Sequence, residues 1–150
     1  MRDADAIIDK YPGDGVMAHF ALNNDGVERA LKSSCIIKRL VDEFVNQELR
    51  NLSLPPIQCG VSIDAPGSTT ALACVGINEH PEIIAVGNSV NIAAKMEKIA
   101  RNRVVIGYDV YRRLSASLKQ YCYAVETGII YAESEKPYPG FSVDWEAVTE

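Results

Sequence analysis

The chain has no long run of hydrophobic residues. In the 150-residue sequence, no apolar segment approaches the length of ~20 residues that a membrane-spanning helix requires. No signal-peptide pattern opens the sequence. Basic segments are also missing, and the formal net charge is −5. Both features argue against a broad nucleic-acid-binding face. We expect neither nucleic acid nor a membrane among its partners, and a cytoplasmic location.

Closely spaced pairs of cysteines are absent from the sequence too. The four cysteines, Cys35, Cys59, Cys74 and Cys122, have no C-x-x-C spacing, and each lies among apolar neighbours. Such cysteines are typical of reduced, buried thiols in a cytosolic protein. No repeat or low-complexity segment interrupts the sequence. The length suits one domain with a hydrophobic core, so we predict a single domain over residues 1–150.

The most informative short stretch is Gly13-Asp14-Gly15, which has apolar runs on both sides. It predicts a β-hairpin formed by Ile7–Tyr11 and Val16–Phe20, because an Asp-Gly pair supplies the positive φ angles of a tight turn. A carboxylate at a hairpin tip is exposed and fixed in direction, which suits a hard cation such as Mg2+. On this stretch alone, the ordinary interpretation is that Asp14 only forms the turn.

Helical and extended patterns alternate along the rest of the chain. Residues 1–6 are typical of the last turn of a helix. Further helices are predicted from the cap residues Asn23–Gly26 to about Arg50, from a cap at Asn88 or Ser89 to about Ala100, and over Tyr108–Leu118. Strands are predicted at Ile57–Ile63 and Thr69–Val75, which form a second hairpin, and at Ile83–Val86, Val104–Ile106, Tyr121–Val125 and Phe141–Val143. This alternation predicts an α+β fold, with helices packed on an antiparallel-rich sheet.

One predicted helix carries a polar strip. Asn91, Lys95 and Lys98 are spaced i, i+4 and i+7 and share one face, while apolar residues cover most of the remaining surface. A helix that is apolar on most sides is largely buried, so its polar strip opens on solvent or on a cleft. An amide and two ammonium groups in a row suit a ribose and phosphates. The alternative is a solvated stripe, since lysines usually point to water.

Two of these stretches resemble one enzyme family. Residues Lys10–Phe20 resemble the metal-binding hairpin of class III nucleotidyl cyclases, the adenylate and guanylate cyclase family, and Val86–Glu97 resembles its second signature helix. The segments Gly60–Ile63 and Val104–Tyr111 follow in the family's order and at plausible spacings. The resemblance extends from the first residues to about Leu114.

The resemblance implies a ferredoxin-like core that forms a head-to-tail homodimer, with active sites at the interface. It also implies an enzyme that converts a nucleoside triphosphate to a 3′,5′-cyclic nucleotide and pyrophosphate with two Mg2+ or Mn2+ ions. Asp14 matches a metal-binding aspartate of the family. Asn91 matches the asparagine that orients the ribose, and Lys95 occupies the catalytic position that follows it.

Two departures concern Lys95 and the base. The family's usual arginine is Lys95 here, which keeps the charge and loses the bidentate fork. Lys10 matches the base-recognising lysine, but its partner position is Ile84, where purine cyclases often have a polar side chain. The substrate is therefore left open between ATP and the CTP or UTP used by family members that make cyclic CMP or cyclic UMP in bacterial antiviral defence.

A third departure concerns the family's opening strand, which carries the other metal-binding aspartate of the family. From the resemblance, this strand would precede residue 1. We expect a sheet without this strand, with a gap between Ile57–Ile63 and Val16–Phe20. We therefore expect the chain as given to be a non-catalytic dimer or larger oligomer with an altered sheet. The alternative to an enzyme is an inactive cyclase-like fragment that dimerises or regulates. An unrelated ferredoxin-like domain is the third possibility.

Overall fold

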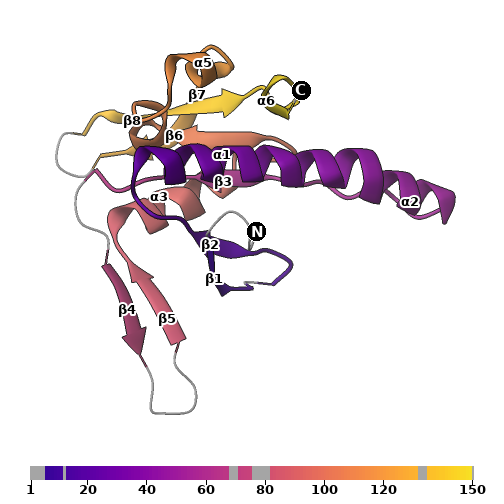
Figure 1. Cartoon of the computed structure of the whole chain (residues 1–150), viewed down its shortest axis with the longest axis horizontal. Helices are drawn as coiled ribbons and strands as arrows, with labels where there is room; N and C mark the ends of the chain where they lie inside the picture. The colour runs from indigo at the N-terminus through magenta and orange to yellow at the C-terminus, as the bar shows by residue number, and fades with distance from the viewer. Residues whose placement is uncertain (1–5, 12, 68–70, 76–81, 132–134, 150) are drawn as a thin grey trace.

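A four-stranded sheet forms the centre of the computed structural model, in the order β3-β6-β8-β7 (Figure 1). Its strands are β3 (Val61–Ile63), β6 (Val104–Gly107), β8 (Pro137–Val143) and β7 (Cys122–Ile130). β3 and β6 are parallel, and the other neighbours are antiparallel. The structure describes residues 6–11, 13–67, 71–75, 82–131 and 135–149.

The strand β6 is buried along its whole length. A short β-branched run suits a strand that is covered on both faces. Side chains alternate along a strand, so Val104 and Ile106 join one hydrophobic cluster while Val105 joins a second one. The predicted buried strand Val104–Ile106 is confirmed.

The helix α1 (Asn24–Arg39) covers the face of the sheet that carries Val104 and Ile106. Its start is fixed by Asn23, whose side chain accepts a hydrogen bond of 2.6 Å from the backbone N–H of Gly26. One stripe of the helix is buried in the first cluster, formed by Val27, Leu31 and Cys35.

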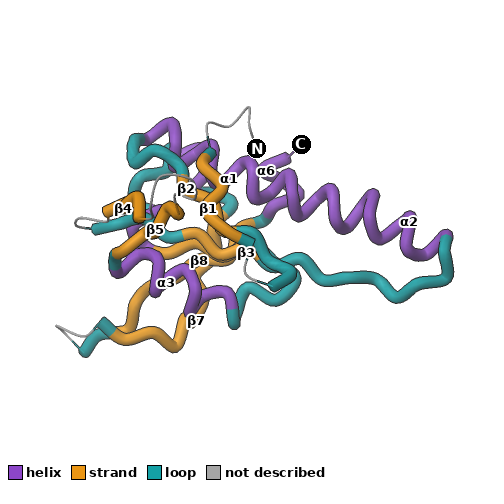
Figure 2. Tube along the Cα trace, turned by 90° about the horizontal axis from the view of Figure 1, so that it is seen from below, coloured by secondary structure: helices purple, strands orange, loops and turns teal. Residues whose placement is uncertain are grey.

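The helix continues beyond the sheet (Figure 2). A π-helical segment (Leu40–Val45) and α2 (Asn46–Asn51) follow α1 directly, so the predicted long helix to about Arg50 is confirmed. The π-helical segment was not predicted, because the apolar spacing does not distinguish it from an α-helix.

The chain returns to the sheet along an exposed segment that is tied to this helix. The side-chain amide of Asn46 is buried, donates to the backbone carbonyl of Ile57 at 3.0 Å and accepts from its N–H at 2.8 Å. These bonds use the backbone groups that a strand would offer to a neighbour. The strand predicted at Ile57–Ile63 accordingly begins only at Val61.

Two hairpins lie outside the central sheet. The first, β1 (Ile7–Lys10) with β2 (Met17–His19), confirms the predicted N-terminal hairpin. The second, β4 (Ala71–Val75) with β5 (Glu82–Val86), extends away from the sheet (Figure 1). The predicted pairing of Ile57–Ile63 with Thr69–Val75 is therefore wrong. β3 pairs with β6, because its apolar side chains pack against the first cluster.

The remaining helices differ in detail from the prediction. α3 (Asn88–Glu97) begins at the N-cap Gly87 without a side-chain hydrogen bond, so the predicted capping by Asn88 or Ser89 is wrong. The single helix predicted at Tyr108–Leu118 is divided into α4 (Tyr108–Tyr111) and α5 (Ala116–Lys119). Between them, Ser115 is extended and its N–H donates to the Glu28 carboxylate at 3.0 Å. The helix α6 (Trp145–Thr149) follows β8.

The strand β3 lies at an edge of the central sheet. In the described part of the chain it pairs with β6 alone, and β1 and β2 form a separate two-stranded sheet. The strands on either side of the predicted gap therefore do not close on each other. The expected ferredoxin-like α+β fold, with helices packed on an antiparallel-rich sheet, is confirmed. The helix end predicted for residues 1–6 lies outside the described residues, apart from Ala6.

No helix within the described ranges is long and apolar enough to cross a membrane.

Three cysteines are free thiols within the described ranges. Cys35 is buried as predicted, whereas Cys59 and Cys122 are only partly buried. Burial raises the pKa of the Cys35 thiol to about 12 and that of Cys122 to about 11. Both therefore stay protonated and unreactive near neutral pH. The side chain of Cys74 lies outside the described residues.

The fold predicts a large difference between two positions on α1. Leu31 is fully buried, and Leu31→Ala should lower the free energy of unfolding by about 2–5 kcal/mol, because it leaves a cavity in the first cluster. Ile36 is 51% exposed, and Ile36→Ala should change it by about 1 kcal/mol or less. Urea unfolding followed by circular dichroism measures both. Equal losses would contradict the packing of α1.

Candidate functional site

Asp14 lies in the exposed turn between β1 and β2. Gly13 has φ +62°, and a Cβ there would meet nothing within 4 Å. The residue with positive φ is therefore Gly13, which precedes Asp14. The sequence instead predicts positive φ angles in the pair Asp14-Gly15. The carboxylate of Asp14 has open access to a cation that approaches from solvent.

A partly buried polar pair stiffens the hairpin below Asp14. The Asp9 side chain, which is 2% exposed, lies 3.1 Å from Nε2 of His19 on the opposite strand. The register of the two strands shifts between Ile8 and Lys10, so Asp9 is the bulged residue. A carboxylate–imidazole contact across a bulge holds the hairpin in one twist. The direction of the turn that carries Asp14 is fixed accordingly.

The polar strip of α3 lies on the exposed part of the helix. Ile92 and Met96 are buried in the second cluster, and together they fix the rotation of the helix. Asn91, Lys95 and Lys98 are all exposed on the opposite side. The helix therefore presents an amide and two ammonium groups in a row, as the sequence predicted, from a rigid support.

A groove of about 560 Å³ runs along the C-terminal half of α3. One wall consists of Lys95, Lys98 and Ile99, and the other is the stretch Thr127–Ile130 of β7. Sequence reasoning missed the second wall, because β7 follows α3 by about thirty residues and only the sheet order brings the two together.

Lys10 and Ile84 lie on neighbouring strands. Lys10 ends β1, Ile84 lies in the middle of β5 opposite Ala73, and the two strands are in contact. The backbone thus brings these two positions into the same region, although their side chains lie outside the described part.

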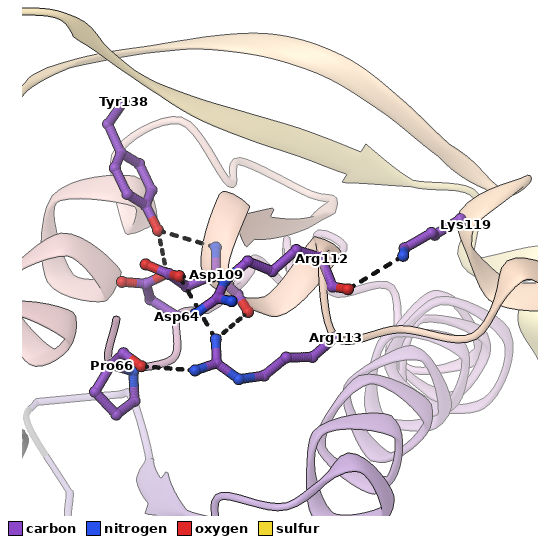
Figure 3. Close-up of polar contacts among 7 residues, drawn as sticks. All are labelled: Asp64, Pro66, Asp109, Arg112, Arg113, Lys119 and Tyr138. Atoms are coloured by element: carbon purple, nitrogen blue, oxygen red, sulfur yellow. Dashed lines mark hydrogen bonds and ion pairs between the residues drawn. The ribbon is translucent and has the colours of Figure 1, made fainter. Parts of the chain in front are cut away.

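A second polar cluster lies at the C-terminal end of β3 (Figure 3). The Tyr138 hydroxyl donates to Asp64 Oδ1 at 2.6 Å and accepts from the Asp109 N–H at 3.4 Å. Gly107 is required beside them, since a Cβ there would collide with Asp64 Oδ1. From the sequence, Asp64 is predicted to be part of a turn, and no local signal indicates its contact with Tyr138.

Burial raises the pKa of the Asp64 carboxyl to about 7, and the Tyr138 hydroxyl opposes this rise. The pKa of Tyr138 is raised by burial and by the same hydrogen bond.

An arginine ties this cluster to the base of the β4–β5 hairpin. Arg113 donates to the backbone carbonyl of Asp109 at 2.6 Å and to that of Pro66 at 3.0 Å (Figure 3). Arg112 donates to the Asp109 carboxylate at 2.7 Å. The loop that leads into β4 is therefore held against α4. These contacts make the cluster a structural joint between the sheet and the hairpin.

The described residues contain no group of three or more His, Cys, Asp or Glu side chains that would hold a metal ion by themselves. Asp14 is a single exposed donor. Mg2+ binds in many nucleotide sites through one or two carboxylates, with phosphates and water completing its octahedron. The donor set therefore fits an ion that arrives with a triphosphate.

Comparisons with known proteins agree with this architecture. No family model matches the chain. The adenylate cyclase of Anabaena cylindrica is 27% identical over 119 residues, which make up 75% of this chain and 23% of that protein. The crystal structure of the guanylyl cyclase Cya2 has a TM-score of 0.77 at 19% identity, covering 95% of this chain and 71% of that one. The adenylyl cyclase CyaB from P. aeruginosa has a TM-score of 0.71 at 16% identity, covering 95% and 73%.

These likenesses extend over nearly the whole chain. The chain has the fold of the catalytic domains of class III nucleotidyl cyclases. It spans less than a quarter of the length of the Anabaena relative. The exposed hairpin tip and the polar strip of α3 are the two places where the sequence resembles that family most specifically.

The joint at Asp64 predicts a pH dependence of stability. Its pKa is about 7 in the folded chain, against an ordinary value of 3.8. The stability that it contributes is therefore complete below pH 3.8 and is lost as pH rises through about 7. Asp64→Asn should remove this decline, which we expect to be on the order of 2 kcal/mol after solvent screening. Urea unfolding between about pH 3 and pH 8, roughly one unit either side of the window from 3.8 to about 7, measures it.

Tyr138→Phe is the matched variant. It removes the hydrogen bond that favours the ionised Asp64 carboxylate. The decline of stability with pH should therefore still occur and should extend to higher pH. If wild type and Asp64→Asn show the same dependence of unfolding free energy on pH, the assignment of this dependence to Asp64 is contradicted.

Proposed function

We propose that this domain converts a nucleoside triphosphate to a 3′,5′-cyclic nucleotide and pyrophosphate. The observation that carries the proposal is the polar strip of α3, which is exposed on a helix whose other side is locked into the second cluster. Its likeness to adenylate and guanylyl cyclases supports the same reaction. The reaction forms a bond between the ribose 3′-oxygen and the α-phosphorus and breaks the bond to the pyrophosphate oxygen.

Two residues of the strip, Asn91 and Lys95, have separate tasks in this proposal. The Asn91 amide donates to and accepts from the ribose, which orients the 3′-hydroxyl towards the α-phosphate. The Lys95 ammonium, one turn further, stabilises the negative charge that develops on the α-phosphate oxygens. Because lysine acts as a point charge, the geometry at phosphorus depends more on Asn91 than it would with a bidentate arginine.

Asp14 is the proposed ligand for Mg2+ or Mn2+. Such ions, two in the complete site, polarise the phosphate oxygens and favour ionisation of the 3′-hydroxyl. The carboxylate is exposed at a stiffened hairpin tip, so it can bind an ion that the triphosphate brings.

The base is read, in this proposal, by Lys10 of β1 and the position of Ile84 on the adjacent β5. An isoleucine forms no hydrogen bond with the amino group of adenine, so the polar readout rests on Lys10. ATP, CTP and UTP all remain candidate substrates. The solved relatives do not decide between bases, since Cya2 is a guanylyl cyclase and CyaB an adenylyl cyclase. A pyrimidine substrate would favour a role in bacterial antiviral defence, and any of these products suits cytoplasmic signal transduction.

A homodimer is part of the proposal. Apolar side chains lie exposed beside the candidate site: Ile7 (46%), Ile8 (40%), Val16 (53%) and Val86 (60%). They flank Asp14 and the start of α3, where a second copy would cover them and close the site. An interface of this kind supports the placement of active sites between two subunits.

The second candidate function is a dimerising or regulatory module without turnover. One observation favours it: Asp14 has no companion carboxylates in a metal-binding group within the described ranges. A two-ion reaction needs further donors, and substrate phosphates supply only part of them.

Incubation with ATP, GTP, CTP and UTP plus Mn2+, followed by mass spectrometry of the products, separates the two functions. The proposed reaction predicts a cyclic nucleotide from at least one triphosphate, whereas the non-catalytic chain expected from the sequence would form none. Asn91→Ala should lower kcat by about 10²-fold and change KM little, because it removes orientation in the transition state. Asn51→Ala, at an exposed position at the end of α2, is the control and should leave kcat within about twofold. Intact triphosphates in all four reactions would favour the regulatory module.

Metal binding has its own test. Mn2+ that is bound together with a non-reacting triphosphate analogue is counted by electron paramagnetic resonance. Asp14→Asn should weaken the binding of Mn2+ by about tenfold or more, because it replaces a charged oxygen ligand with a neutral one. Unchanged Mn2+ binding would remove Asp14 from the metal site.

A further inference from the structure

The groove along α3 contains a lysine to which the proposed reaction gives no task. Lys98 is exposed at the C-cap of α3, on the same face as Asn91 and Lys95. The rise of an α-helix puts Asn91 and Lys98 about 10 Å apart along the axis. This distance is comparable to the length of a ribose with its triphosphate. Lys95 lies between Asn91 and Lys98 along the helix.

The opposite wall of the groove is rigid. The strand β7 leaves its regular pairing with β8 between Glu126 and Ile130, and Gly128 has φ +67°. The Thr127 hydroxyl donates to the Tyr138 carbonyl at 2.7 Å and accepts from the Ile129 N–H at 3.2 Å. These bonds hold the bulge in one shape. A Cβ at Gly128 would meet nothing within 4 Å, so the wall is open above it.

The charge of the groove has one sign. Within the described part of the chain, its lining residues include two lysines and no acidic side chain. The hydroxyl of Thr127 is already used, so the two ammonium groups are the charged donors that a ligand would meet there. Its volume of about 560 Å³ is within the range of small-molecule sites. A ligand with several negative charges in a chain fits these features better than a neutral one.

We propose that Lys98 binds the β- and γ-phosphates of the substrate in this groove. The inference rests on the proposed cyclase reaction and extends it. When the 3′-oxygen bonds to the α-phosphorus, the electron pair of the broken P–O bond leaves with the pyrophosphate, and the 3′ proton passes to water. Lys98 holds the departing pyrophosphate, whereas Lys95 acts at the reacting phosphorus. Lys98 therefore contacts a group whose position changes little during the reaction.

This division of labour predicts different kinetics for the two lysines. A contact that is equally strong in the ground state and the transition state changes KM, whereas a contact made in the transition state changes kcat. Lys98→Gln should raise KM for the triphosphate about tenfold and leave kcat within about twofold. A tenfold rise in KM is the loss of affinity expected when one charged hydrogen bond is removed. Lys98→Arg should restore most of the affinity.

Direct binding tests the inference without turnover. Isothermal titration at low salt with inorganic tripolyphosphate and Mg2+ should give a Kd about tenfold higher for Lys98→Gln than for wild type. The Kd for a nucleoside monophosphate should stay within about twofold. Lys32→Gln removes an exposed lysine on α1 and is the matched control, with no change for either ligand.

The outcomes separate this inference from the proposed function. If Lys98→Gln binds tripolyphosphate as wild type does, or if wild type does not bind it, the inference is overturned even where a cyclic nucleotide forms. A loss of thermal stability with unchanged phosphate binding would assign Lys98 to the helix C-terminus instead. If no triphosphate is cyclised while Lys98→Gln still weakens tripolyphosphate binding, the proposed function fails and the phosphate site stands.

Discussion

Burial of β6 on both faces is the constraint on which the rest of this domain depends. Its alternating side chains divide the interior into two clusters, with Val104 and Ile106 on the side of α1 and Val105 on the side of α3. Each helix must then present an apolar stripe to its own face of the sheet. For α3 this leaves Asn91, Lys95 and Lys98 pointing outward. The orientation of the candidate site is therefore a consequence of core packing.

Two polar joints connect the outer elements to this core. At one end, Lys38 is 1% exposed, contacts Asp42, donates to Asn102 at 3.0 Å and lies 5.1 Å from the ring of Trp145. It thereby links α1, the turn before β6 and α6. At the other end, Asp64, Tyr138 and Arg113 link β3, β8 and α4 to the base of the β4–β5 hairpin. A buried ionisable side chain that loses its partner is costly, so both joints resist rearrangement.

The sequence predicts local features well, because their causes are local. The glycines around Asp14, the apolar period of α1 and the β-branched run at Val104 each specify an element whose position the structure confirms. The face shared by Asn91 and Lys95 follows from helical spacing alone.

What the sequence does not reveal is pairing between distant segments. The parallel contact of β3 with β6 and the hydrogen bond from Tyr138 to Asp64 join residues separated by more than forty positions. Ser115 interrupts a helical pattern because of a contact with Glu28, which no local signal indicates. The groove combines α3 with the bulge of β7 and depends on the sheet order in the same way.

The central claim is that Asp14, the polar strip of α3 and the bulge of β7 form one nucleotide site. Amide chemical-shift mapping of the isotope-labelled chain, titrated with Mg2+ and non-reacting analogues of ATP, CTP and UTP, tests it most directly. The account predicts that at least one analogue shifts Asp14, Asn91, Lys95 and Gly128 together along one saturation curve. It would be contradicted if these amides stayed unchanged with every analogue, or if the shifts gathered at the hollow between Arg39 and Trp145 instead.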